Sequence, residues 1–178
     1  QVGDWDENWR RASGNALSSG VGSAESFVWQ RLSKSVSRAL ATTGISAGDL
    51  IEIGAGGSEW MSLFHKTYGF SVAGLDYSEV GCQRAREVLA KTNVAGDVYL
   101  GDMFTPPPEL INKFDIVASF GLVEHFENTS SAVEACANFA RPGGVVITTI
   151  PNMAGLHGWL YRVYDRKTFD MHVQLTLK

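Results

Sequence analysis

The sequence predicts an α/β fold, a doubly wound parallel sheet with the strand order 3-2-1-4-5. Apolar runs alternate with segments of helical periodicity along most of the chain, which is typical of a parallel sheet covered by helices on both faces. A glycine-rich turn follows the first apolar run, in the segment DLIEIGAGGSEW at residues 49–60. Right-handed crossovers would place a ligand crevice where the winding reverses, at the carboxyl ends of strands one and four.

Each expected element has a local signal. The first helix covers residues 23–41, where apolar side chains recur at helical spacing, and Gly44 ends it. Ser58 and Ser78 are the expected N-caps of the next two helices. The RPGG segment at 141–144 predicts a sharp turn before a β-branched fifth strand. The expected strands are 50–53, 72–75, 98–100, 115–119 and 145–150, and the expected helices are 23–41, 58–67, 78–91, 130–140 and 155–164.

Composition limits the classes of partner. The chain has 178 residues, a length suited to one domain, with 44% hydrophobic residues and a net charge of −4. Its basic residues come in small groups, so we expect no nucleic acid partner, and no apolar run is long enough to predict a membrane partner. Cys82 and Cys136 fall in expected helices without metal-ligand spacing, which predicts buried thiols in a cytoplasmic protein.

The glycine-rich turn and the acids at strand ends form a candidate nucleotide pocket. Gly54 and Gly56 allow close approach of a ligand to the backbone, and the helix behind them offers unpaired N–H groups. Asp76 ends the second expected strand, where a carboxylate can accept hydrogen bonds from a ribose diol. Asp102 and residues 120–125 fall at strand ends on the same edge. In the alternative interpretation, the glycines serve only the turn.

Five segments between residues 49 and 152 carry a resemblance to a known family. They are IEIGAGG, VAGLDYSE, YLGDMF, FDIVASFGLVEHF and RPGGVVITTIPN. Through them the chain resembles the S-adenosylmethionine-dependent methyltransferases with a Rossmann-like fold, especially the small-molecule type that includes ubiquinone-pathway O-methyltransferases. The resemblance implies S-adenosylmethionine as cofactor and a small-molecule acceptor. Phe120-Gly121-Leu122 stands where amino-group methylating enzymes often carry Asn/Asp-Pro-Pro-Tyr, which favours methylation at oxygen or carbon.

The resemblance also implies roles for residues at the strand ends. Glu52 would help to hold the amino-acid part of the cofactor, Asp76 would accept from the ribose hydroxyls, and Asp102 would accept from the adenine amino group. Simple capping of strands and turns is the alternative for all three acids. The full set of implied cofactor-binding residues is Glu52, Gly54, Ala55, Gly56, Asp76, Tyr77, Asp102, Met103 and Phe120.

His125 is the candidate catalytic base, with Glu124 beside it. Histidine ordinarily titrates near neutrality, which suits removal of a proton from an acceptor hydroxyl or amine. Anchoring of the following loop is the alternative role for the pair. In some relatives the Glu-His pair joins a glutamate three residues earlier in a divalent-metal site. That position here is Gly121, so the sequence predicts no metal.

The resemblance divides the chain into three parts within one domain. Residues 1–44 would form a helix and a lid segment in which Trp9 stacks on the cofactor, residues 45–152 the cofactor-binding core, and residues 153–178 part of the acceptor site. The family's sheet normally adds an antiparallel hairpin after this point, whereas this sequence stops at Lys178; either the chain is truncated, or residues 173–177 begin such an addition. We therefore expect a truncated acceptor region and an exposed sheet edge, through which the chain could form an oligomer.

Two other function classes are compatible with the same sheet. An NAD(P)-dependent oxidoreductase would share Asp76, but its G-x-G-x-x-G motif needs glycine where Glu59 stands, and that acid would lie close to a pyrophosphate. Ser58 also replaces the third glycine that is usual in the methyltransferase turn. A non-catalytic cofactor-binding domain is the second alternative.

Overall fold

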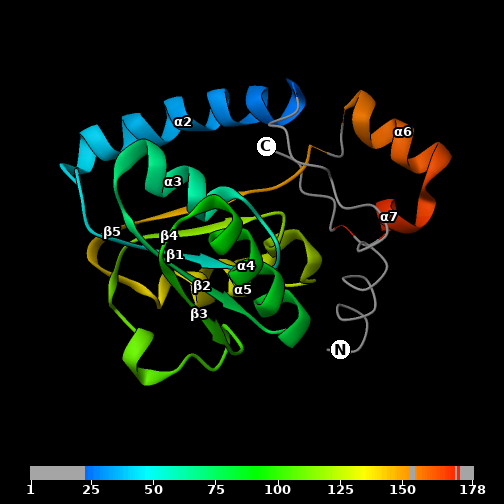
Figure 1. The fold of residues 1–178 in the computed structure, drawn as a ribbon. Coiled ribbons are helices and arrows are strands. Elements are labelled where there is room, and N and C mark those ends of the chain that lie inside the picture. The colour runs from blue at the N-terminus through cyan, green and yellow to red at the C-terminus, as the bar shows by residue number, and fades with distance from the viewer. Residues whose placement is uncertain (1–22, 153–154, 171, 173–178) are drawn as a thin grey trace.

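The computed structural model describes residues 23–152, 155–170 and 172, and it has the predicted sheet (Figure 1). Five parallel strands lie in the order β3-β2-β1-β4-β5, which confirms the doubly wound topology. The strands are β1 (Asp49–Ile53), β2 (Ser71–Asp76), β3 (Gly96–Leu100), β4 (Phe114–Phe120) and β5 (Ala140–Thr149). The expected lid residue Trp9 lies outside the described residues.

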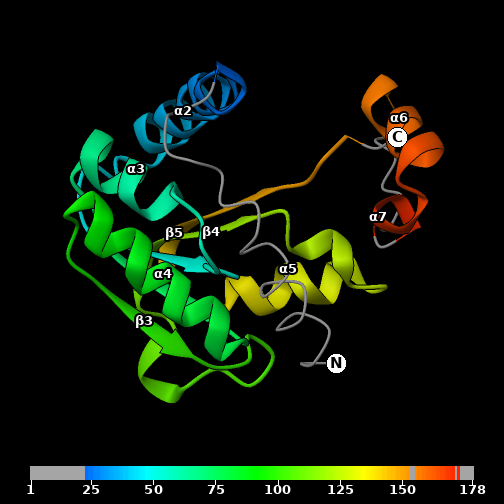
Figure 2. The same ribbon diagram turned by 45° about the vertical axis from the view of Figure 1, so that its right-hand side comes forward.

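Helices cover both faces of the sheet. The helices are α2 (Ser23–Thr43), α3 (Trp60–Tyr68), α4 (Glu79–Thr92), α5 (Thr129–Ala137), α6 (Leu156–Tyr164) and α7 (Arg166–Asp170), with 3-10 turns η2 (Pro108–Leu110) and η3 (Val123–His125). Apolar residues of α2, α3 and α4 form one core cluster against the sheet, and residues of α5 belong to the cluster on the other face. In both views α6 and α7 stand apart from the sheet, beyond the segment that leaves β5 (Figures 1 and 2).

Long-range contacts move two of the boundaries that the sequence predicts. Strand β5 begins at Ala140, and residues 141–144 form an irregularity inside the strand, since Phe114 pairs with Ala140 while Ile116 already pairs with Val145. The predicted cap Ser58 does not cap α3, because its hydroxyl donates to Glu52; the helix begins one residue after Glu59. By contrast, the predicted cap Ser78 accepts from the Gly81 N–H at 3.0 Å.

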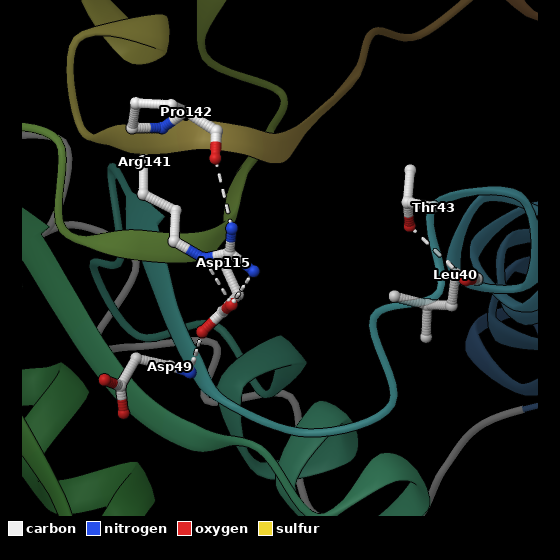
Figure 3. Close-up of polar contacts among 6 residues, drawn as sticks. All are labelled: Leu40, Thr43, Asp49, Asp115, Arg141 and Pro142. Atoms are coloured by element: carbon white, nitrogen blue, oxygen red, sulfur yellow. Dashed lines mark hydrogen bonds and ion pairs between the residues drawn. The ribbon is translucent and has the colours of Figure 1, made fainter.

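Polar contacts fix the end of the sheet opposite the predicted crevice (Figure 3). Asp115 accepts from the Asp49 N–H at 2.8 Å and from Nε of Arg141 at 2.7 Å, so one carboxylate joins the starts of β1, β4 and β5. Burial acts to raise the pKa of Asp115, but these donors outweigh it and lower the pKa. In the same view, the Thr43 hydroxyl donates to the Leu40 carbonyl in the last turn of α2.

Both cysteines are buried free thiols, as the sequence predicts. Cys82 lies in α4, and Cys136 in α5, where burial raises the pKa of its thiol to about 11. Among the helices of the described residues, none has the length and apolar character needed to cross a membrane.

Candidate functional site

The glycine-rich turn links β1 to α3 at the carboxyl edge of the sheet. Gly54 has φ +76°, a conformation that L side chains rarely adopt, and its N–H donates to the Leu75 carbonyl at 2.8 Å. A Cβ at Gly54 would lie 3.2 Å from the Leu122 side chain. Ala55 and Gly56 are buried behind it. The backbone of the turn is therefore tied to β2 and packed closely, as a ligand cradle made of backbone requires.

Asp76 holds this turn in place from the end of β2. Its Oδ2 accepts from the Gly56 N–H and its Oδ1 from the Ser78 N–H, both at 2.8 Å. Gly81 in α4 allows this packing, because a Cβ there would come within 2.6 Å of Oδ1. Asp76 therefore shapes the glycine turn and the start of α4.

Glu52 is buried at the end of β1, directly below the turn. It is 1% exposed, and its Oε1 accepts from the Ser58 hydroxyl at 2.6 Å. Its Oε2 is buried with no hydrogen-bond partner. Burial raises the pKa of Glu52 to about 8, although the Ser58 hydroxyl and the Met61 backbone act to lower it. The turn thus covers an acceptor oxygen that a donor group of a ligand could satisfy.

The remaining predicted residues lie at the ends of β2, β3 and β4. Tyr77 is 40% exposed, whereas Met103 is 5% exposed and belongs to the core cluster under the sheet. Asp102 is half-buried, and its Oδ1 accepts from the Phe104 N–H at 2.9 Å. Phe120 ends β4 beside the turn. The parallel strands bring all the predicted cofactor residues to one edge of the sheet, as expected.

An aromatic wall that the sequence analysis did not identify lies next to the turn. The rings of Trp60, at the start of α3, and Phe120 lie 4.8 Å apart, and the Trp29 ring from α2 lies 5.7 Å from Trp60. Phe64 continues the wall into the core, 5.6 Å from Trp29. The position of Trp60 directly after the glycine turn was the available signal, but its contact with Phe120 depends on tertiary packing.

A second cluster lies just past β4. Glu124 and His125 belong to η3, and His172, which follows α7, brings its ring centroid to 4.8 Å from that of His125. One ligand atom from each of the three residues lies within 4.8 Å of the others. Glu124 is 2% exposed, and neither of its carboxylate oxygens has a hydrogen-bond partner. Glu124 and His125 are adjacent in the sequence, but no sequence pattern places His172 beside them.

Comparisons with known proteins identify the family of this chain. Residues 51–148 match the protein family described as "Methyltransferase domain". The ubiquinone biosynthesis O-methyltransferase of Azoarcus sp. (strain BH72) is 31% identical over 112 residues, which cover 61% of this chain and 46% of that protein. A protein of the same name from Pseudomonas aeruginosa (strain LESB58) is 30% identical over 112 residues, covering 61% and 47%. This chain spans about half the length of the curated relatives it matches.

Solved structures share the fold. PH0226 protein from Pyrococcus horikoshii OT3 superposes with a TM-score of 0.60 at 21% identity, covering 80% of this chain and 62% of that one. An S-adenosylmethionine-dependent methyltransferase from Clostridium acetobutylicum ATCC 824 gives a TM-score of 0.58 at 13% identity, covering 79% and 62%. At these identities the likeness concerns the fold alone.

Proposed function

Since the chain belongs to the methyltransferase domain family, we propose that it transfers a methyl group from S-adenosylmethionine to a small-molecule acceptor. The observation that carries the proposal is the buried Oε2 of Glu52, which has no partner and lies beneath a glycine turn held by Asp76. A buried acceptor without a donor is costly in an isolated protein, and a cationic or N–H-bearing ligand would satisfy it. The residues present therefore fit a cofactor with an ammonium group and a ribose.

Each residue at the sheet edge has a role in this proposal. Glu52 holds the amino-acid portion of the cofactor, and the backbone of Gly54 and Gly56 lines it. Asp76, at the end of β2, accepts from the ribose hydroxyls. Asp102 accepts from the adenine amino group. The remaining members of the proposed cofactor site are Ala55, Tyr77, Met103 and Phe120.

S-adenosylmethionine supplies an activated methyl group on a sulfonium. The protein therefore contributes mainly proximity and alignment of the acceptor. His125, half-buried after β4, would accept a proton from an acceptor that must lose one. The aromatic wall of Trp60 and Phe120 suits an apolar or planar acceptor beside the turn.

Oxygen is the favoured methylated atom, with carbon as the second candidate. The names of the two curated relatives, both ubiquinone biosynthesis O-methyltransferases, support oxygen. The oxidoreductase alternative is not favoured, because Glu59 stands where a pyrophosphate-binding turn needs glycine. We infer a cytoplasmic location, which the two free cysteines support.

The proposal is tested by calorimetric titration with S-adenosylhomocysteine, with NADH in parallel. We expect saturable binding of S-adenosylhomocysteine and none of NADH. Asp76→Asn and Glu52→Gln should each weaken binding by about tenfold or more, because they remove charge-assisted acceptors. Asp97→Asn, which changes an exposed carboxylate on β3, is the matched control and should bind as the wild type does. Binding of NADH alone would contradict the proposal.

A further inference from the structure

We propose that Glu124, His125 and His172 form a binding site for a divalent transition-metal ion of the zinc type. The three side chains come from two distant segments, η3 and the residues after α7. Their ligand atoms already lie within 4.8 Å of one another. Zinc–nitrogen and zinc–oxygen bonds are about 2.0–2.2 Å long, so small side-chain rotations suffice for all three atoms to contact one ion.

Glu124 provides the independent sign of a missing cation. It is 2% exposed, and both carboxylate oxygens are buried without a hydrogen-bond partner. A buried carboxyl group without a hydrogen-bond partner is unfavourable, and buried acidic groups in proteins are usually paired or coordinate metals. A divalent cation bound by Glu124 and the two imidazoles would supply a positive charge. It would also be the bonding partner that the Glu124 oxygens lack among the described residues.

The ligand set indicates which cation is favoured. Two imidazole nitrogens with one carboxylate suit zinc and its first-row neighbours, whereas calcium and magnesium prefer oxygen ligands alone. Three protein ligands leave a coordination position for water or for an oxygen of a bound molecule. Gly121 leaves space on this side, since a Cβ there would still lie 3.6 Å from Glu124 Oε1.

This inference reverses the prediction from sequence. Gly121 removes the ligand that some relatives carry three residues before Glu124, and for that reason the sequence predicted no metal. In the folded chain His172, which follows α7, brings a third candidate ligand atom close to Glu124 and His125. The metal site would also tie the segment after α7 to η3. It does not depend on methyl transfer, because its tests measure metal binding alone, and His125 could serve as the proposed base only while no ion is bound to it.

Calorimetric titration of tag-free protein with Zn²⁺ tests the site directly. We expect one Zn²⁺ per chain, bound at least tenfold more weakly by His172→Asn and by Glu124→Gln. His65→Asn is the matched control, because it removes an imidazole that lies elsewhere, at 2.8 Å from the Phe70 carbonyl. The control should keep the wild-type affinity. Equal affinity in all variants, or no stoichiometric binding by the wild type, would overturn the proposal.

Co²⁺ gives a second measurement with a spectroscopic signature. Visible absorption bands of protein-bound Co²⁺ should appear in the wild type, be displaced by Zn²⁺ and be lost in His172→Asn. His172 lies beyond α7, outside the core clusters, so this variant tests the site even where Glu124→Gln fails to fold. Bands that persist in His172→Asn would mean that the ion binds without this residue, and the proposed site would be wrong.

Discussion

Glu52 places a carboxyl group in the buried core, where a charge is electrostatically unfavourable. A parallel strand buried on both faces normally carries apolar residues, yet β1 has a carboxyl group that is 1% exposed one residue before its end. Burial is the largest cause of its raised pKa of about 8, and the nearby charge of Asp76 raises it further. The native protein therefore favours a protonated Glu52 at neutral pH. A bound cationic group would favour the charged form instead.

The raised pKa predicts a specific pH dependence of stability. Between the unfolded pKa of 4.5 and the folded pKa of about 8, the native state holds a proton that the unfolded state has released. Stability from this group is therefore complete below pH 4.5 and is lost as pH rises toward 8. Between about pH 5 and 8, the melting temperature of Glu52→Gln should rise by several degrees relative to that of the wild type, as measured by thermal unfolding. Glu134→Gln, which changes an exposed carboxylate, is the control and should show no such rise. If the melting temperatures of Glu52→Gln and the wild type changed in parallel with pH, the prediction would be wrong.

Gly48 shows how one element boundary depends on a distant side chain. The residue has φ +138°, and a Cβ there would overlap the Asp115 carboxylate. That carboxylate joins β1, β4 and β5 through Asp49 and Arg141 (Figure 3). The absence of a side chain at position 48 is thus a requirement of strand assembly as well as of the local backbone.

Two glycine variants separate these requirements. Gly48→Ala should lower the free energy of unfolding by roughly 2–5 kcal/mol, the sum of backbone strain and overpacking against Asp115. Gly44→Ala is the matched control, because Gly44 has φ +73° but open space where its Cβ would lie. Gly44→Ala should therefore lower the free energy of unfolding only by the backbone strain, about 1–2 kcal/mol. Urea unfolding measures both, and equal losses would show that the contact with Asp115 contributes nothing.

Sequence patterns predicted the helices and strands where local signals and tertiary packing agree. The β-branched run of β5 and the cap at Ser78 are of this kind. Ser58 was assigned a local capping role, but a buried carboxylate competes for its hydroxyl. The start of β5 was wrong because the pairing of Phe114 with Ala140 draws a turn-like RPGG segment into the strand. In both cases a partner far away in sequence decides the outcome.

The candidate site follows the same division. Gly54, Asp76 and Asp102 were predictable because parallel topology places all strand ends on one edge, whatever the packing. The contact of Trp60 with Phe120 and the approach of His172 to Glu124 were not predictable. Those contacts join segments whose spacing in sequence carries no period and no motif, so only the folded chain brings them together.

The molecule as a whole combines a tightly packed sheet with a lightly attached carboxyl-terminal region. Ile51 in β1 and Val117 in β4 are fully buried. In α6, by contrast, Trp159, Val163 and Tyr164 are 57%, 53% and 81% exposed. Figures 1 and 2 show α6 and α7 beside each other and away from the sheet. Local stability follows the density of buried contacts, so these two regions should open independently.

Hydrogen exchange measured by mass spectrometry tests this division and its link to the metal site. Without metal, peptides covering α6 and α7 should exchange roughly a hundredfold faster or more than those covering β1 and β4. Zn²⁺ should slow exchange in α7, because His172 would then tie the end of the preceding helix to η3, and should leave β1 unchanged. His172→Asn should remove the effect of Zn²⁺ while keeping the fast exchange of the metal-free protein. Equal protection of α6 and β4 without metal would contradict this prediction. It would mean that the carboxyl-terminal helices are locally as stable as the sheet, although they stand apart from it in the fold.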